Sequence, residues 1–189
     1  MLSSSTILRY VATALFLSQC SLVSASIPQS YQHTNLLRTI DLTKPYIRDS
    51  TALILENISN STQNEYFLGI PIDLIPALSY LEVREKKPGS TNLFPVEPAS
   101  QDHPYVSWHR SQSLQSRFLK LYKVELPPMV PAEKISLVIS SAYVDSLLAY
   151  PEVVAQDAKQ YLVYTGEKYA TSLYNTLKQK TKIKFLPIL

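Results

Sequence analysis

Histidine is the side chain in this 189-residue sequence best suited to binding a metal or transferring protons near neutral pH, and it occurs three times, as His33, His103 and His109. The spacing supports neither activity, because the chain has a single cysteine, Cys20, and no His-Glu-x-x-His pattern. Asp102 stands beside His103 in a proline-rich segment that also holds His109, so a hydrolytic site there is one hypothesis. We expect these side chains to be exposed loop residues instead, and we predict no catalytic residue, no metal site and no cofactor.

Nucleophilic serine and phosphate-binding motifs depend on glycines at fixed positions, and the sequence contains only three glycines. It has no Gly-x-Ser-x-Gly elbow and no glycine-rich phosphate loop. Two pairs of nearby carboxylates, Glu82 with Glu85 and Asp49 with Glu56, lack any apolar pocket or partner that the sequence reveals. We interpret these carboxylates as parts of solvated strand faces.

Two N-glycosylation sequons, Asn57-Ile-Ser59 and Asn60-Ser-Thr62, follow one another where a predicted strand gives way to a polar turn. A turn at the end of a strand is expected to be exposed, which would make either asparagine accessible to modification. Acceptors three residues apart would crowd each other. The sequence therefore predicts Asn57 and Asn60 as candidate glycan sites, with at most one glycan.

The first 25 residues have the layout of a cleavable signal peptide. Arg9 precedes a short apolar run over residues 10–17, and Val23-Ser-Ala25 supplies the residues that a signal peptidase reads. We predict cleavage between Ala25 and Ser26, which leaves a lumenal domain over residues 26–189.

The composition of the predicted mature chain excludes several classes of protein. Removal of Cys20 leaves no cysteine, so an oxidising compartment can form no disulfide in it. Removal of Arg9 leaves only a small excess of basic over acidic residues, with the two signs interspersed, which argues against a nucleic-acid partner. No second apolar run approaches the roughly 20 residues that a membrane-spanning helix needs.

Period-2 hydrophobic patterns dominate the chain and predict strands. Tyr66, Leu68 and Ile70 fall on one face of an extended segment, and Phe118, Tyr122 and Val124 fall on one face of another. Seven or more strands favour a mainly β fold, an antiparallel β-sandwich-like lumenal domain with at most one or two short helices. The strands are predicted over residues 51–58, 66–74, 79–84, 118–126, 135–143, 161–164 and 181–186.

Two connections differ from the strands. Residues 152–160 have helix-friendly composition after Pro151, which predicts a single short helix. Residues 86–108 contain Pro95, Pro98 and Pro104 and predict a long connection with little structure of its own, which is a candidate contact surface because loops of this length are commonly functional.

Several sequence blocks, in one order along most of the mature chain, resemble ribophorin I, subunit 1 of the eukaryotic oligosaccharyltransferase. Their specificity comes from this shared order rather than from any single motif. The blocks are Leu36-Leu-Arg-Thr-Ile-Asp-Leu-Thr43, Tyr46-Ile-Arg-Asp49, Ile54-Leu-Glu-Asn-Ile58, Glu65-Tyr-Phe67, Lys134-Ile-Ser-Leu-Val138, Tyr150-Pro-Glu152 and Gln160-Tyr-Leu-Val-Tyr164, followed by Tyr174.

The resemblance implies a non-catalytic subunit of the complex that transfers a lipid-linked oligosaccharide en bloc to Asn-x-Ser/Thr of nascent proteins. It implies as partners the other subunits, including the catalytic one, nascent glycoprotein chains and the translocon. It also implies a location on the lumenal side of the endoplasmic reticulum, in a family anchored by one transmembrane helix. Because this sequence stops before such an anchor, we expect it to be the N-terminal lumenal part only, truncated at its C-terminal end.

One further hypothesis of a different class remains open. A stand-alone secreted β-sandwich module that binds glycans or peptides would share the fold, and Trp108 together with thirteen tyrosines could provide its aromatic binding surface. Core and strand packing explain most of these tyrosines better. Association with the catalytic subunit distinguishes the two hypotheses.

Overall fold

The computed structural model describes residues 30–90, 92–100, 102–103, 119–156 and 159–185, and these residues form a mainly β domain. The only helical element among them is a 3-10 turn, η1 (Ile72–Leu74). The predicted fold class is therefore confirmed. The strands are β1 (Tyr31–Asp41), β2 (Ile47–Asn57), β3 (Gln63–Pro71), β4 (Leu78–Glu85), β5 (Leu93–Phe94), β6 (Val96–Pro98), β7 (Leu119–Met129), β8 (Lys134–Tyr143), β9 (Leu148–Tyr150), β10 (Tyr161–Val163), β11 (Asn175–Thr176) and β12 (Gln179–Lys184).

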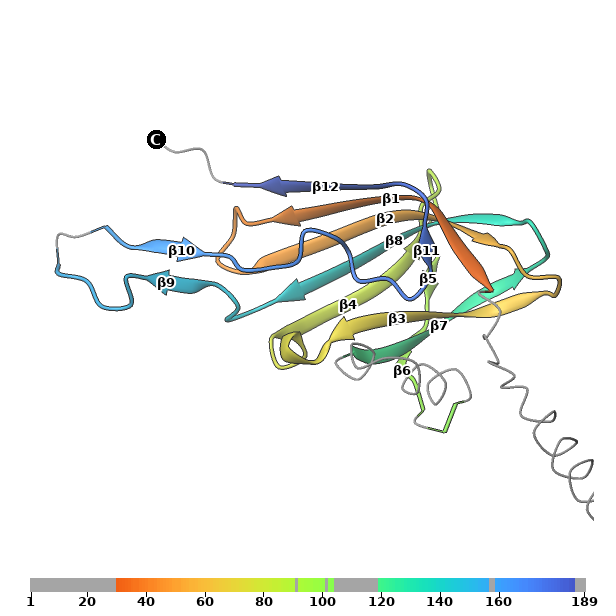
Figure 1. Cartoon of the computed structure of the whole chain (residues 1–189), viewed down its shortest axis with the longest axis horizontal. Helices are drawn as coiled ribbons and strands as arrows, with labels where there is room; N and C mark the ends of the chain where they lie inside the picture. The colour runs from red at the N-terminus through yellow and green to blue at the C-terminus, as the bar shows by residue number, and fades with distance from the viewer. Residues whose placement is uncertain (1–29, 91, 101, 104–118, 157–158, 186–189) are drawn as a thin grey trace, which may run out of the picture.

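The strands are arranged in two facing sheets and one separate hairpin (Figure 1). The larger sheet has seven strands in the order β11-β1-β2-β8-β4-β5, with β12 also paired to β1. Its pairs are antiparallel except that β11 and β12 run parallel to β1. A three-stranded sheet, β3-β7-β6, faces it, and β9 pairs only with β10.

The core lies between the two sheets and joins residues far apart in the sequence. Leu55 on β2 and Leu137 on β8 meet Val124 on β7, and all three are fully buried. Burying aliphatic side chains of this size contributes roughly 1.5–3 kcal/mol each. The alternation of apolar and polar residues that predicted these strands is thus the alternation of core and solvent faces.

Strand β1 was not among the predicted strands, and a β-bulge accounts for this. The register against β2 shifts between His33 and Asn35. Tyr31 and His33 are buried on the near side of the bulge, whereas Leu36 and Ile40 are buried beyond it. A bulge inserts one residue, so the inward face passes from odd to even positions and the period-2 pattern is lost.

Three other sequence predictions need correction. The strand predicted over residues 66–74 ends at Pro71, where the chain enters η1 on its way to β4. The helix predicted over residues 152–160 is absent from the described positions 152–156 and 159–160, where Gln160 Nε2 instead donates hydrogen bonds to the carbonyls of Pro151 and Glu152. The connection over residues 86–108 has structure of its own, since β5 extends the larger sheet and β6 extends the smaller one.

Candidate functional site

His33 lies inside the core rather than in a loop. Its side chain is 2% exposed, with Nε2 3.0 Å from Tyr66 Oη and Nδ1 3.2 Å from both Thr176 Oγ1 and Ser172 Oγ. Burial lowers the pKa of His33 to about 4, so the imidazole is neutral at physiological pH. The contacts of His33 are those of a core residue that ties β1 to β3 and β11.

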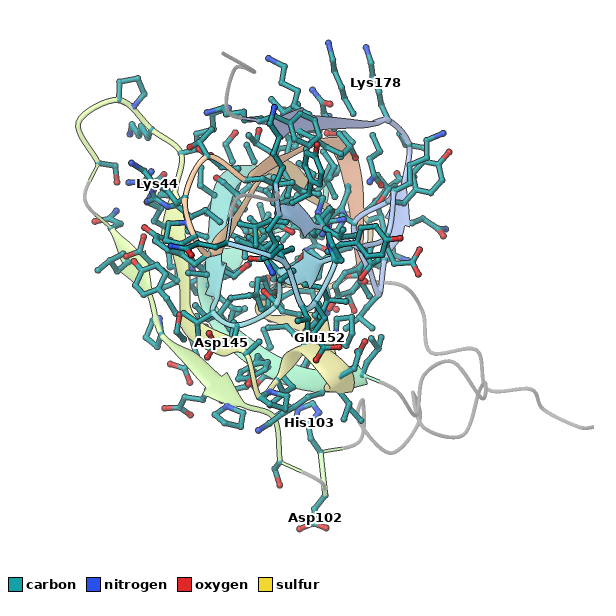
Figure 2. All side chains as sticks on the ribbon, turned by 90° about the vertical axis from the view of Figure 1, so that its left-hand side faces the viewer. Lys44, Asp102, His103, Asp145, Glu152 and Lys178 are labelled. Atoms are coloured by element: carbon teal, nitrogen blue, oxygen red, sulfur yellow. The ribbon has the colours of Figure 1, made fainter. Side chains whose placement is uncertain are left out.

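The segment proposed for hydrolysis is divided by the structure. His103 packs against the β3 residues Glu65, at 3.3 Å from Nε2 to Oε2, and Phe67, with ring centroids 4.9 Å apart. Asp102 is exposed at the outer tip of the loop, while the ring of His103 turns toward the domain (Figure 2). His109 lies outside the described residues. No group of three or more histidine, cysteine and acidic side chains able to hold a metal occurs in the described part of the chain.

A cavity of about 490 Å³ lies between the larger sheet, β3 and residues 164–171, and it contains an ion pair that sequence reasoning missed. Arg38 donates from Nε to Asp49 Oδ2 at 2.8 Å, and Nη2 lies 2.6 Å from the same oxygen. The side chains are 12% and 13% exposed. The earlier interpretation of Asp49 as part of a solvated face is wrong.

The position of this pair follows from the strand register. Arg38 on β1 is opposite Thr51 on β2, so Asp49 is its diagonal neighbour on the same face. Arg38 Nη1 also donates to the carbonyls of Glu167, at 2.8 Å, and Tyr169, at 3.2 Å. The guanidinium thus fastens the segment after β10 to the sheet. It is unsuited to acid–base chemistry because arginine does not release its proton in proteins.

The two sequon asparagines have opposite environments. Asn57 is fully buried at the end of β2, whereas Asn60, three residues further on, is exposed. The expectation that the turn would expose both asparagines is therefore wrong for Asn57. The predicted cleavage residues, Ala25 and Ser26, lie outside the described residues.

The β9–β10 hairpin projects from the end of the domain to which the β8 strand leads (Figure 1). The register pairs Tyr150 with Tyr161 and Leu148 with Val163, so these four side chains share one face, which we call the hairpin face. They are 67%, 62%, 61% and 37% exposed, in that order. A cluster of large apolar side chains exposed on a projecting element is typical of a protein contact surface.

No helix in the described residues is long and apolar enough to cross a membrane. Three features of the described residues are candidate sites: the hairpin face, the cavity that contains Arg38 and Asp49, and the turn between β2 and β3 that holds both sequons.

Comparison with known proteins identifies the family. The family model described as Ribophorin I matches residues 31–187, which include all of the described strands. The chain belongs to the ribophorin I family. Two relatives are both named dolichyl-diphosphooligosaccharide--protein glycosyltransferase subunit 1. The relative from Schizosaccharomyces pombe is 30% identical to this chain, and the relative from Caenorhabditis elegans is 24% identical. Each match covers 82% of this chain.

The match covers 30% and 24% of these two relatives, so the chain spans less than a third of their length. Among solved structures, an M1 zinc metallopeptidase from Deinococcus radiodurans aligns with a TM-score of 0.36 and 12% identity over 63% of this chain and 21% of its own chain. A likeness this weak carries no functional inference. The recognition of the ribophorin I family from the ordered sequence blocks is confirmed.

Proposed function

We propose that this chain is part of a non-catalytic subunit of the oligosaccharyltransferase complex, and that it supports en bloc transfer of a lipid-linked oligosaccharide to Asn-x-Ser/Thr of nascent proteins. The observation that carries the proposal is the match of the ribophorin I family over residues 31–187, together with two relatives named as subunit 1 of that transferase. In this proposal, cleavage between Ala25 and Ser26 removes residues 1–25, and the remaining domain acts on the lumenal side of the endoplasmic reticulum.

The proposed mode of action is contact rather than chemistry. The hairpin face, formed by Leu148, Tyr150, Tyr161 and Val163, is the proposed surface for an apolar patch of another subunit. The catalytic subunit, nascent glycoprotein chains and the translocon are the proposed partners, with no nucleic acid among them.

The connection between β4 and β7 is a second proposed contact surface. Its described part runs along both sheets, with β5 on the larger and β6 on the smaller. This fixes the path of its backbone while leaving Leu93 62% exposed. A nascent chain or a second subunit could contact both layers of the domain along this path.

A depletion experiment tests the proposal. Lowering the amount of the chain in its own cells is expected to reduce occupancy of sequons on a secreted reporter, measured by peptide mass spectrometry. The purified chain is expected to transfer no oligosaccharide from a lipid-linked donor to an acceptor peptide. Unchanged reporter occupancy after depletion would contradict the proposal and favour a stand-alone binding module, while transfer by the purified chain would contradict its non-catalytic nature.

A further inference from the structure

The β2–β3 turn places two sequons three residues apart in opposite environments. Asn57, the last residue of β2, is fully buried. Asn60 is exposed, as are Ser61 and Thr62, which complete its sequon. Sequence motifs alone treat the two acceptors as equivalent, but the structure does not.

The side chain of Asn57 has all four of its hydrogen-bonding positions in use. Its Nδ2 donates to the carbonyls of Ser61, at 2.9 Å, and Met129, at 2.8 Å. Its Oδ1 accepts from Ser59 twice, from the backbone N–H at 3.0 Å and from Oγ at 2.7 Å. Both nitrogen-bound hydrogens are therefore committed to backbone oxygens within the domain.

The backbone of Asn57 adds two more bonds to the same junction. Its N–H donates to the carbonyl of Glu133 at 3.0 Å, and its carbonyl accepts from the N–H of Ala132 at 2.8 Å. Asn57 therefore joins the end of β2 to the turn between β7 and β8. A sugar attached to Nδ2 would replace one of the two hydrogens and would need space that a fully buried side chain does not have.

We propose that Asn60 carries an N-linked glycan in the folded protein and that Asn57 is a structural residue that carries none. In the modification, Asn60 Nδ2 forms a bond to the anomeric carbon of a lipid-linked diphospho-oligosaccharide, and the bond from that carbon to the phosphate oxygen breaks. The lipid diphosphate leaves with the bonding electrons, and the amide nitrogen loses one proton to a base of the transferase. The product is a neutral secondary amide on the surface of the turn.

The position of the turn fits a permanent glycan. The β2–β3 turn lies at the opposite end of the domain from the β9–β10 hairpin (Figure 1). The first residue of β8, Lys134, pairs with Glu56 next to this turn, whereas the last residue of β8, Tyr143, leads to β9 at the other end. A glycan on Asn60 therefore leaves the hairpin face uncovered. The inference rests on the lumenal location included in the proposed function, but it does not depend on assembly into the complex.

The decisive experiment maps the glycan on the full chain expressed with its own leader in a glycosylating eukaryotic cell. Folded, monomeric protein is purified, its N-terminus is determined to establish lumenal processing, and it is treated with peptide N-glycosidase in ¹⁸O-labelled water, which converts each glycosylated asparagine to labelled aspartate. We expect the label at Asn60 and not at Asn57. Label at Asn57 in the folded fraction, or at neither residue of a processed chain, would overturn the proposal.

Matched sequon variants provide an independent readout. Thr62→Ala removes the Asn60 sequon without changing Asn60, and Ser59→Ala removes the Asn57 sequon. We expect Thr62→Ala to lose the mobility shift on deglycosylation and Ser59→Ala to retain it. The reverse pattern would assign the glycan to Asn57 and contradict the proposal. Co-purification with other subunits is a separate measurement, so failure of the proposed function does not alter these outcomes.

The structural role of Asn57 has its own test in the melting temperature. Asn57→Asp keeps the two acceptor contacts with Ser59 but leaves the buried carbonyl of Met129 without the Nδ2 donor and removes one of the two donors to the carbonyl of Ser61. We expect the Tm to fall by several degrees, up to about 10 °C, because a buried carbonyl left without a donor destabilises the folded state. The control, Asn60→Asp, makes the same chemical change on the surface when all proteins compared are produced without glycans, and it should leave Tm nearly unchanged. Equal Tm values for the two variants would refute the structural role.

Discussion

The buried imidazole of His33 predicts a specific loss of stability in mild acid. Its pKa is lowered from 6.5 to about 4 by burial, so the folded chain holds the neutral form. The unfolded chain binds a proton below pH 6.5, whereas the folded chain resists protonation until about pH 4. The contribution of His33 to the unfolding free energy is therefore fully present above pH 6.5 and is lost progressively as the pH falls toward 4.

The magnitude follows from the two pKa values. Because only the unfolded state binds the proton in this range, the unfolding free energy is lower by about 2 kcal/mol at pH 5 than at pH 8, and by about 3 kcal/mol near pH 4. Solvent screening hardly reduces this free energy, because the His33 side chain is 2% exposed. Near neutral pH the group has almost no effect, because both states hold it largely neutral.

Urea unfolding at pH 8 and pH 5 measures the effect. The wild-type chain should lose about 2 kcal/mol more of its unfolding free energy over this interval than His33→Gln, which cannot titrate. Val83→Ala is the control for loss of buried volume: it keeps His33, so it should show the wild-type pH dependence. Equal pH dependence in wild type and His33→Gln would refute the reasoning.

Three further predictions address other parts of the domain. Replacing Arg38 with Met should lower the unfolding free energy by about 3–5 kcal/mol, because it leaves the buried Asp49 carboxylate unpaired. Adding Asp49→Asn should restore part of the loss. If the free-energy changes of the two single variants, measured by urea unfolding, add up to that of the double variant, a direct pair is contradicted. Ala132→Gly should raise the unfolding free energy by about 0.5–1 kcal/mol, because Ala132 has a φ of 63° in the Val130–Glu133 turn, a left-handed conformation that glycine adopts without strain. A Tm no higher than that of the wild type would count against strain at this position. Leu148→Ser should change the Tm by no more than a degree or two, since the side chain is 61% exposed, and a large fall would show that the hairpin face packs within the domain.

The sequence predicted the fold class because most strands alternate regularly between a core face and a solvent face. Strands β3 and β7 were predicted from this alternation, and β2, β4 and β8 from stretches rich in Ile, Val, Leu and Tyr. Strand β1 was not, because the bulge after His33 shifts its buried residues from odd to even positions. No local pattern signals such a shift, since it depends on how the partner strand aligns.

The site features escaped prediction for a related reason. Arg38 and Asp49 become partners through a diagonal contact between two strands, and this requires the register of β1 against β2. Asn57 is buried by Met129, which lies 72 positions further along the chain. Local composition marks both Asp49 and Asn57 as surface residues, and only long-range pairing places them inside. The family, in contrast, was recognisable because ordered sequence blocks retain it without any knowledge of contacts.

Quantitative co-purification with the catalytic subunit from detergent-solubilised endoplasmic reticulum membranes tests the central proposal most directly. The tagged chain is expected to recover the catalytic subunit, and the double variant Leu148→Ser, Tyr161→Ser is expected to recover several-fold less. Leu162→Ser, which is equally exposed at 64% but lies on the opposite side of the hairpin, should recover as much as wild type. Absence of the catalytic subunit from the wild-type preparation would contradict the assignment to the complex, and equal recovery by all variants would contradict the hairpin face as its contact surface.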